Sequence, residues 1–325
     1  MKTLTFDNGD AMPALGLGTW KSGPGEVGAA VVAALELGYR HIDCAWIYGN
    51  EAEVGQALHE CLRRQIVARD DVWITSKLWC DAHAPEHVEP ALRETLEALR
   101  LEYLDLYLMH WPIAVEKGIW IPQSVDEMIA LEDLPVETTW RAMERLVDRG
   151  LCRHIGVSNF SVKKLSSLHS TARIKPAVNQ VEMHPYLKQG PLIEYCREHR
   201  IALTAYSPFG SRDRAPALKQ PDEPDLFVDS TIVSIADAHG ATPAQVILAW
   251  LLSRGVSTIP KSVNRARLTQ NLAAQSLELT SAEQARIDRI DHRYRFVSGQ
   301  FWALPGGPYT VETLWDETSD GRPIS

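Results

Sequence analysis

A regular alternation of short apolar strands and amphipathic helices constrains the fold of this chain more than any other feature. It begins near Leu15 and gives eight strand–helix pairs, of which the last helix ends near Ala274. The strands are rich in β-branched residues, as strands buried in a parallel sheet are. Eight such units predict an α/β protein whose strands close into a (β/α)8 TIM barrel rather than an open doubly wound sheet.

Further elements are predicted at both ends of the barrel. The Asn8-Gly9 turn between two short strands predicts an N-terminal β-hairpin. An extra C-terminal helix, Ser281 to Arg289, precedes a C-terminal loop rich in aromatic residues, and the two longest connections are 112–135 and 209–229. We expect strands at 15–19, 39–44, 72–78, 103–111, 153–158, 177–183, 202–207 and 257–260, and helices at 26–37, 51–64, 87–100, 136–149, 162–172, 190–200, 230–252 and 265–274.

Composition and charge narrow the class of protein. The 325 residues show no linker and no low-complexity segment, so we expect one domain over 1–325. The formal net charge of -9 argues against nucleic acid or an anionic membrane as a partner. The five cysteines are scattered and odd in number, and no apolar run is long enough to span a bilayer. We expect a soluble, cytoplasmic monomer or weak dimer.

An acid and a phenol follow the second predicted strand. Asp43 lies at the end of strand 39–44, and Tyr48 lies in the loop before a helix that opens at Asn50. In a barrel both side chains reach the C-terminal rim, where such folds place their active sites. A phenol with an ordinary pKa of about 10 is a poor proton donor at neutral pH unless a cation or another donor shifts that pKa.

Two further strand ends supply a cation and a second donor. Lys77 lies near the end of strand 72–78, where it can pair with Asp43 and act on Tyr48. His110 lies near the end of strand 103–111, where a ring nitrogen can donate to the oxygen that Tyr48 protonates. The simpler interpretation is a structural ion pair and a core histidine. We favour a functional site, because a buried ion pair is costly unless something uses it.

Seven groups of short motifs then follow one another in order. They are Gly-Leu-Gly-Thr-Trp at 16–20, His-Ile-Asp at 41–43 with Tyr-Gly-Asn-Glu at 48–51, Ser-Lys-Leu-Trp at 76–79, Asp-Leu-Tyr-Leu-Met-His-Trp-Pro at 105–112, Gly-Val-Ser-Asn-Phe at 156–160, Asn-Gln-Val-Glu-Met-His-Pro-Tyr at 179–186 and Ile-Pro-Lys-Ser-Val at 259–263. From about Asp7 to about Asp291 the chain resembles the aldo-keto reductase superfamily, of the aldose and aldehyde reductase type.

The resemblance implies a catalytic tetrad and a reaction. The tetrad falls on Asp43, Tyr48, Lys77 and His110, and all four residues are present. The implied activity is that of an NADPH-dependent oxidoreductase, which reduces an aldehyde, and in some cases a sugar aldehyde or a ketone, to an alcohol by hydride transfer. Tyr48 would be the general acid, Lys77 held by Asp43 would lower its pKa, and His110 would position the carbonyl oxygen.

The cofactor would be held outside any Rossmann fingerprint. Gly16-Leu17-Gly18 lacks the third glycine and the following helix that this fingerprint needs. By resemblance the carboxamide would bind Ser158, Asn159 and Gln180, and Tyr206 would stack on the nicotinamide. The full set of expected cofactor-binding residues is Gly18, Thr19, Trp20, Asp43, Ser158, Asn159, Gln180, Tyr206, Ser207, Pro208, Phe209, Lys261, Ser262, Val263, Arg267, Gln270 and Asn271.

A basic cluster at 261–267 bears on the choice between NADPH and NADH. It combines bases and hydroxyls at a predicted helix N-terminus, which suits the 2′-phosphate of NADPH. For Arg265 we favour a solvated helix charge. Asn264 and Gln270 depart from the commoner threonine and glutamate of the family, so NADH stays open as a weaker alternative.

The substrate, a small carbonyl compound, would meet an aromatic pocket. The expected substrate-binding residues are Trp20, Tyr48, Trp79, His110, Trp111 and Trp302. For Trp302 and for Trp46 the pocket and the ordinary core are equally good interpretations. Specificity stays open among aromatic, aliphatic and sugar-derived aldehydes.

Three other interpretations were weighed. Cys80, His83 and His87 are close in sequence, but we expect surface residues and no metal site there. The barrel could be a different enzyme, such as a metal-dependent hydrolase, which the lack of a His/Asp/Glu ligand cluster at the strand ends disfavours. Some relatives of this fold are nicotinamide-binding auxiliary modules with little turnover, and the intact tetrad favours the enzyme over that alternative.

Overall fold

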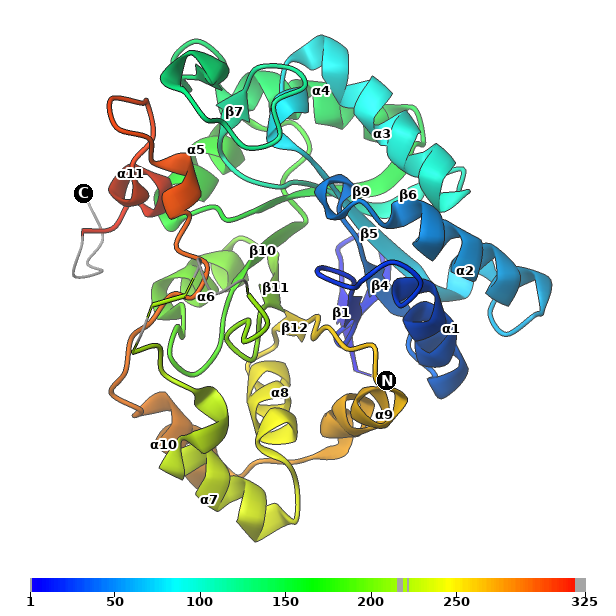
Figure 1. The fold of residues 1–325 in the computed structure, drawn as a ribbon, viewed down its shortest axis with the longest axis vertical. Coiled ribbons are helices and arrows are strands. Elements are labelled where there is room, and N and C mark those ends of the chain that lie inside the picture. The colour runs from blue at the N-terminus through cyan, green and yellow to red at the C-terminus, as the bar shows by residue number, and fades with distance from the viewer. Residues whose placement is uncertain (1, 215–218, 221, 319–325) are drawn as a thin grey trace.

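The computed structural model describes residues 2–214, 219–220 and 222–318. Figure 1 shows strands at the centre of the molecule with helices around them. The eight-stranded sheet has the order β12-β11-β10-β9-β6-β5-β4-β3, and every pair within it is parallel. Its strands are β3 (Leu17–Gly18), β4 (His41–Asp43), β5 (Trp73–Leu78), β6 (Leu104–Met109), β9 (Cys152–Ser158), β10 (Val178–Glu182), β11 (Ala202–Tyr206) and β12 (Ser257–Thr258).

Backbone hydrogen bonds join the first strand to the last. Gly16 N donates to Thr258 O at 2.9 Å, and Thr258 N donates to Ala14 O at 2.8 Å. An added Cβ at Gly18 would lie 2.7 Å from the carbonyl oxygen of Ile259, so only glycine allows this approach. The Gly16-Leu17-Gly18 motif therefore closes the barrel, and the (β/α)8 prediction is confirmed.

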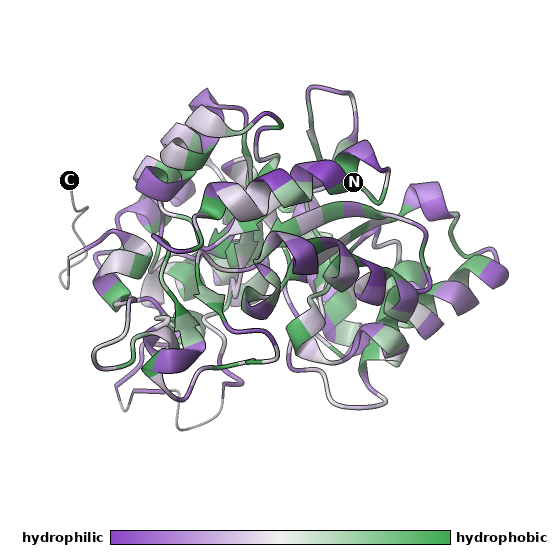
Figure 2. Ribbon diagram, turned by 90° about the horizontal axis from the view of Figure 1, so that it is seen from above, coloured by the Kyte–Doolittle hydropathy of each residue, from purple (hydrophilic) through white to green (hydrophobic). Residues whose placement is uncertain are grey.

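Helices cover the outside of the barrel. Figure 2 shows hydrophobic residues gathered on the central strands and hydrophilic residues on the outer helix surfaces. The helices are α1 (Val27–Leu37), α2 (Glu51–Arg63), α3 (Pro85–Leu99), α4 (Val136–Asp148), α5 (Val162–Thr171), α6 (Gly190–Glu198), α7 (Ser230–His239), α8 (Pro243–Ser253), α9 (Arg265–Ala273), α10 (Ser281–Asp288) and α11 (Val311–Trp315). Among the described residues, no helix is long and apolar enough to cross a membrane.

One predicted helix is wrong. The segment 230–252 forms two helices, because Gly240 ends α7 in the left-handed conformation, with φ at 58°. Thr242 then caps α8 in a capping box with Gln245, and Pro243 occupies the first turn of that helix. Strands 15–19 and 257–260 are also shorter than predicted, with two residues each in β3 and β12. All other βα units lie where the alternation places them.

Two hairpins and the C-terminal segment complete the molecule. The predicted N-terminal hairpin is β1 (Thr3–Thr5) paired with β2 (Ala11–Pro13). A second hairpin, β7 (Ala114–Val115) with β8 (Met128–Ile129), lies within the long connection 112–135. The C-terminal segment lies beside α5 (Figure 1), where Lys164 Nζ is 2.6 Å from Asp316 Oδ2. Of the connection 209–229, residues 215–218 and 221 lie outside the described residues, as do 319–325.

Candidate active site

Three neighbouring strands bring the predicted tetrad together. Asp43 is the last residue of β4, Lys77 is in β5, and His110 directly follows β6. Tyr48 ends a short 3-10 helix, Trp46–Tyr48, that follows β4. Because β4, β5 and β6 are adjacent and parallel, their C-terminal ends open on one side of the barrel.

The Lys77 ammonium is the centre of this group. Lys77 and Asp43 are both buried, and Lys77 Nζ lies 2.5 Å from Asp43 Oδ1. The same nitrogen donates to the backbone carbonyl of Cys44 at 2.8 Å and lies 3.4 Å from the Tyr48 hydroxyl. Gln180 Nε2 donates to the second Asp43 oxygen at 2.7 Å. The ion pair is therefore held by hydrogen bonds with Cys44, directly after β4, and with Gln180 of β10.

The phenol of Tyr48 keeps its proton at neutral pH. Burial raises the pKa of Tyr48 to about 12, although the charge of Lys77 acts in the opposite direction. Burial lowers the pKa of Lys77, but Asp43, Tyr48 and Cys44 together outweigh burial, so the net shift of that pKa is upward. The charge of Lys77 lowers the pKa of Tyr48, as expected. Burial raises the same pKa more, so the net shift is upward.

His110 is a neutral imidazole beside the phenol. Burial, together with the charge of Lys77 and the nearby His83, lowers the pKa of His110 well below its ordinary value. Its ring centroid lies 6.0 Å from that of Tyr48 and 5.1 Å from that of Trp79. Nδ1 is buried without a hydrogen-bond partner among the described residues. A neutral ring has one nitrogen that donates and one that accepts, so it can offer a single proton to an oxygen in the cavity.

The expected carboxamide site is a connected polar group. Asn159 has a positive φ of 64°, and its Nδ2 donates to the His110 carbonyl at 2.9 Å. Tyr206 donates to Asn159 Oδ1 at 2.7 Å, and Ser158 donates to the carbonyl of Gln180 at 2.7 Å. These contacts join Ser158 and Asn159, at the end of β9, to Gln180 in β10 and to Tyr206, at the end of β11.

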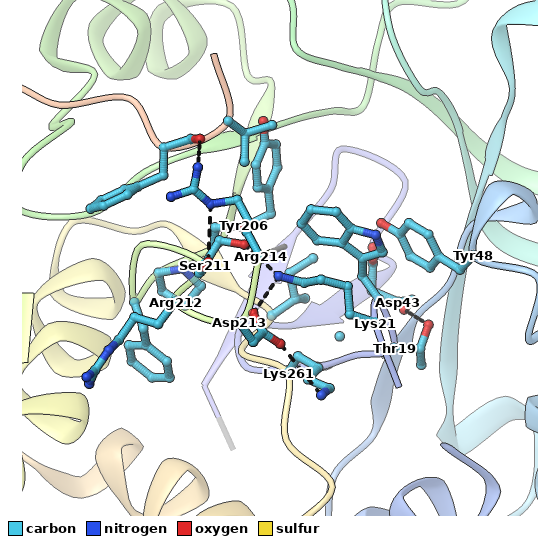
Figure 3. Close-up of a pocket in the computed structure, with 18 of the residues that line it drawn as sticks. Thr19, Lys21, Asp43, Tyr48, Tyr206, Ser211, Arg212, Asp213, Arg214 and Lys261 are labelled. Carbon is cyan, nitrogen blue, oxygen red and sulfur yellow. Dashed lines mark hydrogen bonds and ion pairs between the residues drawn. The ribbon is translucent and has the colours of Figure 1, made fainter. Parts of the chain in front are cut away.

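Charged side chains from distant segments meet across the cavity. Lys21 Nζ lies 2.5 Å from Asp213 Oδ1 and donates to Ser211 Oγ at 2.7 Å. Lys261 Nζ lies 3.7 Å from the other Asp213 oxygen. Figure 3 shows Asp213 between Lys21 and Lys261. We call Lys21, Asp213 and Lys261 the bridge. It links the loop after β3, the 209–229 connection and the loop after β12.

The basic cluster lies at the N-terminus of α9. Asn264 caps this helix by accepting from Arg267 N at 3.0 Å. Arg265 points away from the cavity and pairs with Glu36 of α1 at 2.9 Å, in agreement with the expected surface role. Arg267 lines the cavity with Lys261, so two arginines in the first turn of α9 lie in different surroundings.

One cavity of about 1270 Å³ contains nearly all of these residues. Asp43, Tyr48, His110 and every predicted cofactor-binding residue line it, and so does every predicted substrate-binding residue except Trp302. Lys77 does not line the cavity; it is fully buried next to Asp43 and Tyr48. Sequence reasoning missed a further set that lines it as well. The set is Lys21, Ile47, Ile121, Ser211, Arg212, Asp213, Arg214, Gln220, Phe227, Thr242, Pro243, Ala244, Ile259, Phe296, Val297, Ser298, Gln300 and Phe301. Of these residues, the basic ones, Lys21, Arg212 and Arg214, could have been considered as phosphate-binding candidates, because the chain as a whole is acidic.

Trp302 lies behind the wall of the cavity rather than in it. It is 1% exposed and packs 5.6 Å from Trp79 and 6.1 Å from Trp111, measured between ring centroids. Those two rings separate it from the cavity, which they line. Trp46 also lies outside the lining; its ring nitrogen donates to Glu94 at 3.0 Å.

Cys80 and His83 are not the surface residues that we expected. Cys80 is fully buried and His83 is 3% exposed, because the chain after β5 turns inward through a short 3-10 helix, Cys80–Ala82. Within 2–214, 219–220 and 222–318, no group of three or more His, Cys, Asp or Glu side chains could hold a metal ion.

Known proteins share this fold and sequence. The model of the Aldo/keto reductase family matches residues 14–292. Aldo/keto reductase slr0942 of Synechocystis sp. is 54% identical over 317 residues, which cover 98% of this chain and 97% of that protein. Aldo-keto reductase family 1 member A1 of Bos taurus is 47% identical over 90% of both chains. The solved aldose reductase of Schistosoma japonicum has a TM-score of 0.85 and 40% identity, covering 93% of this chain and 96% of its own.

The chain therefore belongs to the aldo-keto reductase family, and the resemblance seen in its motifs is confirmed.

Proposed function

We propose that this protein is an NADPH-dependent reductase that converts aldehydes to alcohols. One observation carries the proposal: Lys77 lies within 3.4 Å of a Tyr48 phenol that keeps its proton at neutral pH, in a cavity that also holds His110. The relatives named above as aldo-keto and aldose reductases support the same class of reaction.

The residues around the cavity fit a nicotinamide dinucleotide phosphate. The amide groups of Asn159 and Gln180 and the hydroxyl of Ser158 can hydrogen-bond a carboxamide. Lys21, Lys261 and Arg267 place positive charge along the rest of the same cavity, although the chain as a whole carries a formal net charge of -9. This concentration of cations suits phosphate groups, and Lys261 with Arg267 suits the 2′-phosphate that distinguishes NADPH from NADH.

Proton transfer falls to Tyr48. The cofactor, when bound, supplies the hydride. Tyr48 gives its proton to the carbonyl oxygen of the substrate, and the adjacent Lys77 ammonium stabilises the phenolate that forms. Asp43, held by Gln180, keeps Lys77 charged and oriented. His110 donates from its neutral ring to the same carbonyl oxygen and so positions it for attack.

The competing proposal is a cofactor-binding module with little turnover. The two are separated by following NADPH absorbance with simple, aromatic and sugar-derived aldehydes, with NADH measured in parallel. We expect turnover with NADPH, and weaker use of NADH. Tight NADPH binding without turnover on any of these carbonyls would favour the module.

A further inference from the structure

We propose that Glu182 is a positioning residue for substrate selection, because its buried carboxylate fixes the segment 296–301 that forms one wall of the cavity. Glu182 is the last residue of β10, and its carboxylate bonds neither to the tetrad nor to the basic cluster. The proposal rests on the proposed reductase function and extends it to the part of the site that distinguishes one carbonyl compound from another.

The Glu182 carboxylate has three donors around it. Oε1 accepts from Phe296 N at 2.7 Å and lies 2.8 Å from His184 Nε2, and Oε2 accepts from Val297 N at 2.7 Å. Burial opposes its charge, but His184, Arg295 and the Val297 amide outweigh burial, so the pKa of Glu182 lies below its ordinary value. An ionised carboxylate only accepts, and therefore His184 Nε2 carries the proton.

The segment that Glu182 holds faces the substrate side of the cavity. Val297, Ser298, Gln300 and Phe301 all line it, and Phe301 packs edge-on against Trp111 at 5.6 Å between ring centroids. The segment lies in no strand or α-helix; a short 3-10 helix, Gln300–Trp302, begins within it. Its position depends on anchors supplied from elsewhere in the chain.

A second anchor reaches the same segment from its far end. Trp315 Nε1 donates to the carbonyl of Ser298 at 2.7 Å. Directly after the anchored residues, Gly299 has a φ of 77°, a conformation that favours glycine, and a Cβ there would lie 2.3 Å from Leu314 Cδ2. The chain therefore turns immediately beyond the positions held by Glu182 and Trp315.

The peptide of Phe296 also meets the loop that carries the bridge. Its N–H is held by Glu182, and its carbonyl accepts from Arg214 Nη1 at 2.5 Å. Arg214 directly follows Asp213, the central residue of the bridge, and Figure 3 shows the two side by side. Phe296 is thus the point at which the substrate wall and the charged loop contact each other.

The test compares Glu182→Gln with a matched variant, Glu144→Gln. Glu144 is also buried, and its carboxylate accepts from two consecutive backbone amides, Arg173 N at 2.7 Å and Ile174 N at 2.9 Å. Those amides precede β10, whereas Glu182 ends it, so Glu144 lies toward the opposite end of the barrel. Glutamine keeps the volume and removes the charge in both variants. At Glu144 it can still accept both amides, which share Oε1, but at Glu182 it cannot, because the two amides donate to different oxygens.

We expect Glu182→Gln to raise KM for a bulky aldehyde, 4-nitrobenzaldehyde, by about tenfold, the scale of one lost hydrogen bond to a charged group. The kcat and KM for propanal, which reaches only the tetrad, stay within about twofold of wild type, because the change leaves the tetrad intact. Glu144→Gln lowers stability without changing the preference between the two aldehydes. An unchanged preference in Glu182→Gln, or the same change in both variants, would overturn the proposal.

Amide hydrogen exchange of Phe296 and Val297 gives a second readout that needs no turnover. We expect both amides to exchange slowly in the wild type, and faster in Glu182→Gln but not in Glu144→Gln. Fast exchange in the wild type would refute the anchor even if the variants failed to fold. If the wild type reduced neither aldehyde, the proposed function would fail, and the exchange rates would still decide whether Glu182 holds the wall.

Discussion

The two sides of the cavity are held in different ways. The charged side depends on the bridge, in which Asp213 is half exposed and Lys21 is 22% exposed. The aromatic side consists of Trp79, Trp111 and Phe301, with buried Trp302 behind them. Exposed ion pairs contribute only about 0.2–1 kcal/mol each, whereas burying a large aromatic ring contributes several times more.

The two sides should therefore respond differently to substitution. The bridge consists of partly exposed ion pairs, so it contributes little to stability. The aromatic side is held by burial, so a change there should cost more. The first variant removes the buried Lys77–Asp43 pair, and the last two change one side of the cavity at a time.

The largest effect is expected from removing Lys77. Lys77→Met leaves Asp43 buried and unpaired, which costs about 3–5 kcal/mol of stability, and it removes the cation next to Tyr48. The double variant Lys77→Met/Asp43→Leu should recover most of the stability but none of the activity. Thermal unfolding and aldehyde turnover measure both properties. Recovery of turnover in the double variant would show that the pair is only structural.

A pH effect on stability should come from the buried residue Glu51 and not from the bridge. Burial raises the pKa of Glu51 to about 7, although Ser76 and Thr95 donate to its carboxylate. A carboxyl that binds its proton more tightly when folded loses stability as pH rises from its unfolded pKa toward 7. The expected loss is about 3 kcal/mol between pH 4.5 and pH 7, with little change above that.

The Glu51→Gln variant removes this contribution. Its melting temperature should fall less than that of the wild type between pH 5 and pH 8, because the variant has no carboxyl to ionise at this position. Asp213→Asn is the comparison from the bridge, and its pH dependence should match that of the wild type. Parallel pH profiles for wild type and Glu51→Gln would rule out this source.

On the charged side, Arg267→Ala should weaken NADPH binding by about tenfold, because it removes a hydrogen-bonded charge from the expected phosphate site. NADH binding should be unchanged. Arg265→Ala is the matched control, since it lies in the same helix turn and pairs with Glu36 outside the cavity. Fluorescence titration with both cofactors gives the affinities. Equal losses for NADPH and NADH would contradict the assignment of Arg267.

On the aromatic side, Phe301→Ala should raise KM for an aromatic aldehyde by about threefold, since it removes the edge-on contact with Trp111. NADPH affinity should not change. A variant that altered cofactor affinity and substrate KM together would mean that the two sides are not separate.

The strand ends were predictable from the sequence and the walls were not. Asp43, Lys77 and His110 could be placed together because alternation fixes where strands end, and the ends of parallel strands meet. Lys21 and Asp213 are 192 positions apart, and nothing in their local sequence indicates that they pair. The wall at 296–301 follows no periodicity, so its position depends on long-range contacts such as those of Glu182.

One helix break was visible in the local sequence, and the position of Trp302 was not. Gly240, Thr242 and Pro243 are ordinary helix stop and start residues, and they would have divided the segment 230–252. Trp302 resembled a pocket residue by its chemistry alone. The positive φ of Gly299 turns the chain there, so Phe301 lines the cavity and Trp302 lies behind it.

The most direct test of the account measures NADPH binding and aldehyde turnover in Tyr48→Phe beside the wild type. The variant keeps the ring that stacks near Trp20 and loses only the hydroxyl beside Lys77. We predict unchanged NADPH affinity and a loss of turnover of about 10²–10⁴-fold, the usual contribution of a general acid. Turnover comparable to the wild type would contradict the assignment of Tyr48 as the proton donor.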